Sequence, residues 1–365
     1  LLLIPSVLGY LHTRVNYDIL SYLPENIETM KGQDILVDEF GTGAFSTFVV
    51  DGMSNKEISV LKAKIEDVDH VKTVLWYDSV ADISIPTDML PEKMQKVFLS
   101  DEGTLMFIMY DTTMSADETM EAVEQIRAIS NEQCFLSGMS AVVTDIRDLS
   151  DKEVPVYVLL AVILSLVVLS LTMDSFLIPI FFLLSIGMAI IYNLGTNVFM
   201  GEISYVTKAL SAVLQLGVTM DYSIFLWHSY ENQKKIFAED HKNAMAHAIA
   251  QTVTSVVGSS VTTVAGFIAL CFMSFTLGMD LGIVMAKGVV FGVIGCVTIL
   301  PSMILIFDKP LEKTRHKAIL PDIGKLSGFV TKRFPVFLLI FAVLLLPAIY
   351  GQKNAEVYYD LAGTL

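Results

Sequence analysis

One acidic residue lies deep inside an apolar stretch, in the segment LQLGVTMDYSIFLW. This residue, Asp221, falls well within the membrane helix that we expect over residues 206–228. An ionised, unpaired carboxylate at that depth costs at least about 2.5–3.5 kcal/mol, so its protonated form is favoured. Asp221 could therefore take up a proton from one side of a membrane and release it to the other, the alternative being a structural aspartate held by hydrogen bonds between helices. Tyr222 could orient the carboxyl group of Asp221 or relay its proton, although plain helix packing explains this tyrosine equally well.

Small and hydroxylated residues recur at three- and four-residue spacing in the next apolar stretch. This spacing places them on one face of a helix, where small side chains let helices approach closely and hydroxyls can bond a neighbouring carboxyl group. Helix packing alone is the simpler interpretation, and a face that supports Asp221 is the functional one. The residues are Ser255, Gly258, Ser259, Thr262, Thr263 and Gly266.

Lys287 is a basic residue inside a later apolar stretch, beside Gly288 and Gly292 in a GxxxG spacing. We expect it to lie nearer the outer surface than Asp221. It is a possible charge partner for a residue in a second half of the protein, or a side chain that extends its ammonium group toward the interface. Direct pairing with Asp221 is the weaker interpretation.

The sequence carries no motif of a nucleotide-dependent or hydrolytic enzyme. A Walker loop, a nucleophile elbow and an HExxH motif are all missing, so we predict no catalytic residue and no cofactor. The histidines at 228–247 lack metal-ligand spacing, and we predict no metal site. The formal net charge of −15 comes from an acidic excess in residues 11–153, which argues against a nucleic-acid partner.

Composition and span lengths indicate a multi-pass membrane protein. The chain is 53% hydrophobic with a mean hydropathy of +0.60, and a membrane span needs about 20 apolar residues. We expect spans near residues 154–172, 175–194, 206–228, 252–274, 281–307 and 334–351.

The remaining segments follow from these spans. Residues 1–10 are apolar but short, and we interpret them as the end of a truncated first membrane helix. Residues 11–153 form a polar outer domain, and the spans of 154–307 form a five-helix membrane bundle. A basic linker at 308–333 joins it to the helix at 334–351, and 352–365 begin a second outer domain.

The distribution of basic residues orients the chain. Lysine and arginine are concentrated in the linker at 308–333 and in the loop after residue 228, and positive loops stay in the cytoplasm. We therefore expect a protein of the cell (cytoplasmic) membrane with residues 11–153 on the extracytoplasmic side.

The sequence of the polar domain predicts two successive strand–helix–strand units. Strands are expected at 45–50, 71–77, 104–110 and 133–136, with helices at 55–65 and 116–129 between the members of each pair. This order predicts a ferredoxin-like βαββαβ domain.

An internal repeat links the two ends of the chain. LLLIPSVLG at 1–9 matches VLLLPAIYG at 343–351, and VNYDILSYL at 15–23 matches VYYDLAGTL at 357–365 in the same register. We interpret the chain as half of a two-fold internal repeat, whose natural partner is the missing second half of the same protein.

The string running from Gly217 to Asp221 and Tyr222 resembles the GxxxDY motif on the fourth membrane helix of MMPL-type transporters, within the RND (resistance–nodulation–division) superfamily. This resemblance implies an α-helical polytopic membrane protein with an extracytoplasmic α+β porter domain. It implies proton-motive-force-driven export of lipids or other hydrophobic or amphiphilic molecules, with Asp221 and Tyr222 as a proton-relay pair. The supporting residues would be Gly217, Ser255, Ser259, Thr262 and Thr263.

The resemblance has two departures and leaves alternatives open. His228 and Ser229 stand where family members often have an arginine, and the second half is absent. The expected partners are protons, membrane lipids and a hydrophobic substrate, and a homo-oligomer is compatible. A protein-export auxiliary of the same superfamily and a sterol-sensing or receptor-like lipid-binding membrane module remain alternatives.

Overall fold

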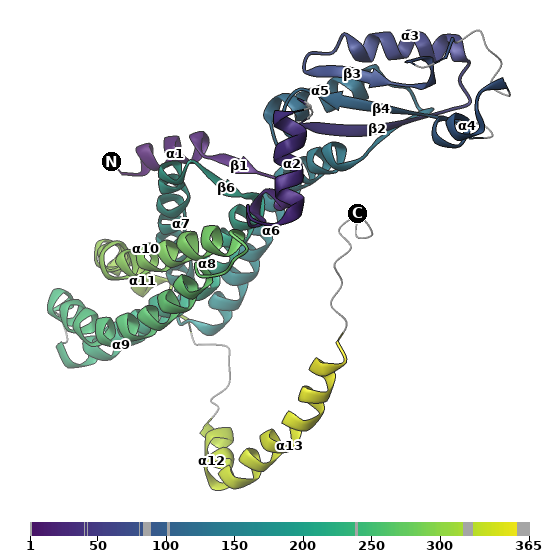
Figure 1. Cartoon of the computed structure of the whole chain (residues 1–365). Coiled ribbons are helices and arrows are strands. Elements are labelled where there is room, and N and C mark those ends of the chain that lie inside the picture. Colours follow the sequence, from purple (N-terminus) through teal and green to yellow (C-terminus); the bar gives the residue numbers. More distant parts are fainter. Residues whose placement is uncertain are drawn as a thin grey trace.

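The computed structural model describes residues 2–39, 41, 43–79, 81–82, 89–100, 103–237, 240–316 and 324–355. Within them, an α+β domain stands beside a bundle of long helices (Figure 1). Predictions that concern residues 317–323 of the linker and 356–365 of the second outer domain lie outside the described residues. This includes the repeat segment at 357–365, so the internal repeat stays a prediction.

Among the described residues, six helices are long and apolar enough to cross a membrane, which confirms a multi-pass membrane protein. They are α6 (Met139–Thr172), α7 (Leu177–Gly195, continued by the 3-10 turn η4, Thr196–Met200), α8 (Tyr205–Phe237), α9 (His241–Leu270), α10 (Leu277–Ile306) and α13 (Phe334–Lys353). Several extend beyond the apolar stretch that predicted them: α6 begins before residue 154 and α9 before residue 252.

The centre of the bundle is formed by α7, α8 and α10, with α9 packed along α8 and α10. Phe182, Leu226, Tyr230 and Leu300 are fully buried in its apolar core. In contrast, α6 and α13 bury little or nothing of their apolar lengths. Helix α13 lies apart from the bundle, together with the short helix α12 (Gly324–Lys332) (Figure 1).

The first helix, α1 (Leu3–His12), crosses α7 at a point where two glycines meet. A Cβ atom added at Gly195 would lie 2.1 Å from the carbonyl oxygen of Ser6, and one added at Gly9 would lie 2.3 Å from the carbonyl oxygen of Gly195. The two backbones are therefore in direct contact, which only glycine permits.

The α+β domain, called the outer domain after its predicted location, is built on a four-stranded antiparallel sheet with the order β3-β4-β2-β5. Along the chain its elements are β2 (Ala44–Asp51), α3 (Asn55–Glu66), β3 (Val71–Leu75), α4 (Glu92–Phe98), β4 (Gly103–Tyr110), α5 (Asp117–Ile129) and β5 (Cys134–Ser137). The predicted strand at 71–77 ends at Leu75, because Trp76 and Tyr77 turn into the core and are fully buried.

Helices α3 and α5 cover one face of this sheet. Side chains alternate along β2, so that Phe48 and Val50 point into the core while Phe45 and Val49 are exposed on the other face. Phe135 of β5 adds to the exposed apolar face.

A short junction joins the outer domain to the bundle. The strand β1 (Arg14–Asn16) pairs in parallel with β6 (Glu202–Ser204), which leads directly into α8. After β1 come the 3-10 turn η1 (Ile19–Tyr22) and the helix α2 (Glu28–Asp38). The strand that precedes α8 is thereby hydrogen-bonded to the chain segment that leads into the outer domain.

Candidate functional site

The paired residues Asp221 and Tyr222 point to different sides of α8. Neighbouring residues on a helix are about 100° apart, and here Tyr222 is 4% exposed whereas Asp221 is exposed on the surface of the bundle. The carboxylate therefore lies on a face that the described part of the chain does not cover.

Asp221 and Tyr222 nevertheless share one cavity with the polar face of α9. It has a volume of about 240 Å³ and is lined by Val218, Asp221, Tyr222, Phe225, Ser255, Val256, Ser259 and Thr263. Three hydroxyl groups of α9 and the phenol of α8 thus surround the open space beside the carboxylate. This set can hydrogen-bond a carboxyl group in either protonation state.

Two of the predicted supporting residues lie outside this cavity. Thr262 is exposed, and its hydroxyl donates to the carbonyl oxygen of Ser259 at 2.7 Å. At Gly217 of α8, an added Cβ atom would meet no atom within 4 Å.

The small residues on α9 are not explained by packing within the described chain. Added Cβ atoms at Gly258 and Gly266 would also meet nothing within 4 Å, and both glycines are exposed. The stripe of small and hydroxylated residues on α9 is therefore an uncovered face of the bundle, continuous with Asp221.

Lys287 lies on a different side of the bundle. Its ammonium group donates to the side-chain oxygen of Asn197 in η4. Asp280 lies seven residues earlier on α10, so the two charges share one face of that helix. Lys287 does not line the Asp221 cavity.

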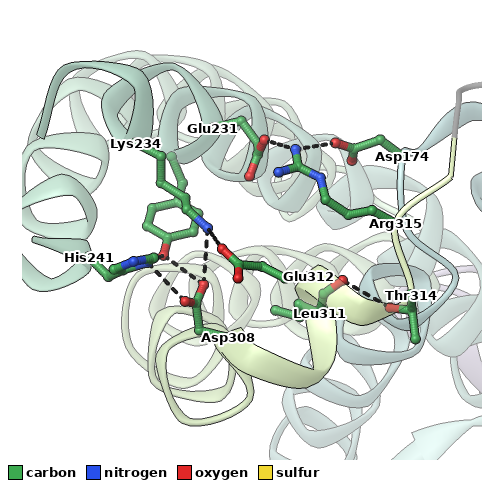
Figure 2. Close-up of polar contacts among 10 residues, drawn as sticks. Asp174, Glu231, Lys234, His241, Asp308, Leu311, Glu312, Thr314 and Arg315 are labelled. Atoms are coloured by element: carbon green, nitrogen blue, oxygen red, sulfur yellow. Dashed lines mark hydrogen bonds and ion pairs between the residues drawn. The ribbon is translucent and has the colours of Figure 1, made fainter. Parts of the chain in front are cut away.

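A network of ion pairs joins the C-terminal end of α8 to the turn before α7 and to the segment after α10 (Figure 2). Arg315 contacts Asp174 at 2.8 Å and also pairs with Glu231 of α8, while the indole of Trp227 donates to Asp174 at 3.1 Å. Although burial opposes the shift, the hydrogen bonds from Arg315 and Trp227 lower the pKa of Asp174 below its ordinary value. The start of the linker is thereby fixed to α8 and to the turn before α7.

A second group lies next to it, around Asp308 of the short helix α11 (Asp308–Lys313) (Figure 2). Lys234 contacts Asp308 at 3.3 Å and Glu312 at 3.1 Å, and His241 contacts Asp308 at 2.9 Å. His241, Asp308 and Glu312 have the atoms and the proximity to hold a metal ion. However, the ammonium group of Lys234 already contacts both carboxylates, so the protein itself places a cation between them.

Sequence reasoning missed this network of ion pairs. Asp308 and Glu312 are four residues apart, as are Glu231 and Lys235, which is ordinary for a solvated helix. One signal was available in the sequence. Asp308 directly follows the last apolar residue of the span at 281–307, and Lys234 lies at the basic end of another membrane helix.

A family model described as the MMPL family matches residues 24–326 of this chain. The membrane protein MJ1562 of Methanocaldococcus jannaschii is 26% identical over 275 residues, which cover 72% of this chain and 64% of that protein. The siderophore exporter MmpL5 of Mycobacterium tuberculosis is 25% identical over 212 residues, covering 55% of this chain and 22% of MmpL5. The probable transport protein MmpL12 of the same organism is 21% identical over 322 residues, which cover 87% of this chain and 27% of MmpL12.

Among solved structures, the crystal structure of SecDF in its super-membrane-facing form matches 74% of this chain and 34% of the SecDF chain. The TM-score is 0.37 and the identity 13%, which is too low to establish a shared fold. The chain spans 64% of MJ1562 and less than a third of the two mycobacterial proteins.

Proposed function

Because this chain belongs to the MMPL family, we propose that it forms part of a proton-driven exporter of lipids or other hydrophobic or amphiphilic molecules. The proposed activity is that of a whole transporter, and this chain spans 64% or less of the length of the three relatives described above. In this proposal Asp221 is the residue whose protonation drives the cycle, and Tyr222 orients it.

The observation that carries the proposal is the cavity beside Asp221. It combines a carboxylate, a phenol and three hydroxyls in the middle of the membrane helices α8 and α9. Such polar groups are costly inside a bilayer, and they are therefore a functional hypothesis by default. Their open side is continuous with the uncovered stripe on α9, and in this proposal a second half of the transporter packs against it.

Protonation would change how this face packs. The ionised carboxylate needs water or a donor, whereas the neutral acid can be enclosed between helices. Closure of the second half over α8 and α9 would then depend on the proton, and this is the coupling that an exporter requires.

The outer domain is the porter in this proposal. Its strand order and its two strand–helix–strand units support a ferredoxin-like βαββαβ sandwich. The β1–β6 pair offers a route by which a movement of α8 reaches the start of this domain.

The test is proton flux in liposomes that contain the full-length protein. Internal pH is followed after a proton gradient is imposed, for the wild type, for Asp221→Asn and for Asp240→Asn. The last is a matched control, because Asp240 caps the cytoplasmic start of α9 and asparagine caps a helix equally well. We expect Asp221→Asn to lose at least about 90% of the flux and Asp240→Asn to keep it. Equal flux in folded wild type and Asp221→Asn would refute the proposal and favour a lipid-sensing membrane module.

A further inference from the structure

A second cavity lies between α2 and the β1–β6 pair, and it shares no lining residue with the Asp221 cavity. One of its walls is a face of α2, and the others come from β1, η1, β6 and the loop at 113–115 (Figure 1). Its volume is about 490 Å³, within the range of about 300–1,000 Å³ that is typical of small-molecule sites. The cavity therefore touches both the outer domain and the strand that leads into α8.

The walls of this cavity carry five half-buried apolar side chains. They are Leu20 and Leu23 at η1, Met30 and Val37 on α2, and Met114 in the loop before α5. Unbranched methionine side chains adapt to ligands of varied shape. Such a lining suits the apolar body of an organic molecule.

Four carboxylates also line the cavity, against one guanidinium group. The acids are Asp18, Asp34, Asp38 and Glu202, and the base is Arg14. None of these five side chains is in an ion pair within the part of the chain that the structure describes. The cavity therefore has an excess of negative charge, which attracts a cation and repels an anion.

Asp18 is the most buried of these acids, with 8% of its surface exposed. Its Oδ1 accepts from the backbone N–H of Leu20 at 2.9 Å, and no cation among the described residues contacts it. Although the backbone N–H groups of Leu20 and Ser21 oppose the shift, burial raises the pKa of Asp18 above its ordinary value. A buried carboxylate without a counter-ion is unfavourable, so a positive charge in the cavity would stabilise its ionised form.

Asp34 and Asp38 are placed against the preferences of their own helix. They lie four residues apart in the second half of α2, whose last turn holds no basic residue. Like charges at this spacing repel each other, and negative charge near a helix C-terminus is unfavourable. Helix stability therefore does not favour this pair of acids, whereas a positively charged ligand in the cavity would.

The spread of the four carboxylates distinguishes an organic cation from a metal ion. A metal ion needs several ligand atoms around one point. Within the described ranges, however, no three of these acids have carboxylate oxygens that all lie within 4.8 Å of one another. Their charges instead surround an apolar space, and this arrangement fits a cation that carries its charge on an apolar body.

One end of the cavity is held by hydrogen bonds from Asn16 of β1, which is 7% exposed. Its amide donates to Glu202 of β6 at 3.2 Å and to the hydroxyl of Ser21 at 2.9 Å. Its side-chain oxygen accepts from the backbone N–H of Asp18 at 2.9 Å. Asp18 and Glu202 are thereby held in place before a ligand binds, which lowers the entropic cost of binding.

We propose that this cavity binds an amphiphilic organic cation, with its apolar body against η1 and α2 and its positive charge beside Asp18, Asp34 and Asp38. That this cation is a substrate of the exporter rests on the proposed function, whereas its binding does not. Because Glu202 belongs to the strand that leads into α8, a ligand in the cavity bridges the outer domain and the start of the helix that carries Asp221.

Binding is tested by equilibrium dialysis of the full-length protein in detergent, without a proton gradient. The probes are tetraphenylphosphonium and tetraphenylborate, which have nearly the same size and shape and opposite charges, and protein-free micelles give the background. We expect tetraphenylphosphonium to bind at least about ten times more tightly than tetraphenylborate. Equal binding of the two ions, or no binding of the cation, would overturn the proposal.

The position of the site is tested with the double variant Asp34→Asn/Asp38→Asn. Both side chains are exposed, and their removal relieves α2 of unfavourable charge, so the variant should fold, which circular dichroism checks. We expect its affinity for tetraphenylphosphonium to fall at least about fivefold. The matched control is Asp67→Asn/Asp69→Asn, which removes two exposed acids of the same domain outside the cavity and should bind as wild type does. An equal fall in both variants would mean nonspecific attraction to an acidic domain and would refute the site.

The proton-flux assay separates this inference from the proposed function. Lost flux in Asp221→Asn, together with no binding of tetraphenylphosphonium by wild type, would overturn the cation site and leave the proton-driven exporter intact. Selective binding of the cation, together with wild-type flux in Asp221→Asn, would support the site and overturn the exporter.

Discussion

The crossing of α1 and α7 gives a sharp test of the packing described here, through Gly195→Ala. The backbone of Gly195 is ordinary helix (φ −66°, ψ −31°), so alanine causes no strain of its own there. Its methyl group, however, would lie 2.1 Å from the carbonyl oxygen of Ser6. Because that atom belongs to the backbone of α1, the two helices must separate.

The cost of such overpacking is about 1–3 kcal/mol. Gly187→Ala is the matched control, since Gly187 lies in the same helix with nothing within 4 Å of its added Cβ atom. In that position alanine gains up to about 1 kcal/mol of helix propensity. The two variants should therefore move stability in opposite directions.

The assay is the apparent melting temperature of purified protein in detergent. With roughly 2–4 °C per kcal/mol for a domain of this size, we expect Gly195→Ala to melt lower by about 2–12 °C and Gly187→Ala to melt no lower than wild type. A Gly195→Ala protein as stable as wild type would refute the close approach of α1 and α7. The same conclusion would follow if both variants lost equal stability.

Three further predictions concern ion pairs and buried donors. Arg315→Gln removes the ion pairs with Asp174 and Glu231 and, because the guanidinium group is partly exposed to solvent, should lower stability by only about 0.5–1 kcal/mol, whereas Lys313→Gln should not lower it. Because the folded-state pKa of Asp174 is lowered, the Asp174 share of this loss is full above its ordinary pKa of 3.8 and fades in more acidic solution, which melting curves at several pH values would detect. Lys234→Ala removes the ammonium group between Asp308 and Glu312, so added Zn²⁺ should raise the melting temperature of this variant and not of wild type. If Zn²⁺ shifts the melting temperatures of the two proteins equally, Lys234 does not occupy a latent metal site. Thr104→Val removes the hydroxyl that accepts from the indole N–H of Trp76 at 2.8 Å, so it should destabilise the outer domain by about 1–3 kcal/mol. Unfolding is followed by tryptophan fluorescence, with Thr47→Val on β2 as the control. Equal loss of stability in both variants would contradict the role of this hydrogen bond.

The elements that sequence predicted well are those with a strong local pattern. Alternating side chains marked β2 and β4, and apolar length marked the membrane helices. Helix ends were less well predicted, because polar residues such as those of 139–153 and 229–237 continue a helix outside the apolar core. The β1–β6 pair was missed entirely, since its strands lie far apart in sequence and have three residues each.

Part of the candidate site was predicted, because the spacing of residues along a helix is also a local pattern. Helical spacing alone put Ser255, Ser259 and Thr263 on one face, and the structure brings that face to Asp221 and Tyr222. Spacing could not show that Asp221 points away from the bundle, because this depends on how α8 is rotated against α7 and α10. Nor could it pair Lys287 with Asn197, which comes from another helix.

The length of α6 has a mechanical consequence. This single helix of 34 residues runs from the outer domain into the membrane, so it is about 51 Å long. A bend of about 10° at Pro155 would displace the domain end of the helix, about 24 Å away, by about 4 Å. Pro155 lies inside this helix and removes one backbone hydrogen bond, which marks a natural pivot. Since little of the apolar part of α6 is buried, few protein contacts resist such a swing, and the helix can act as a lever that magnifies small rearrangements in the bundle.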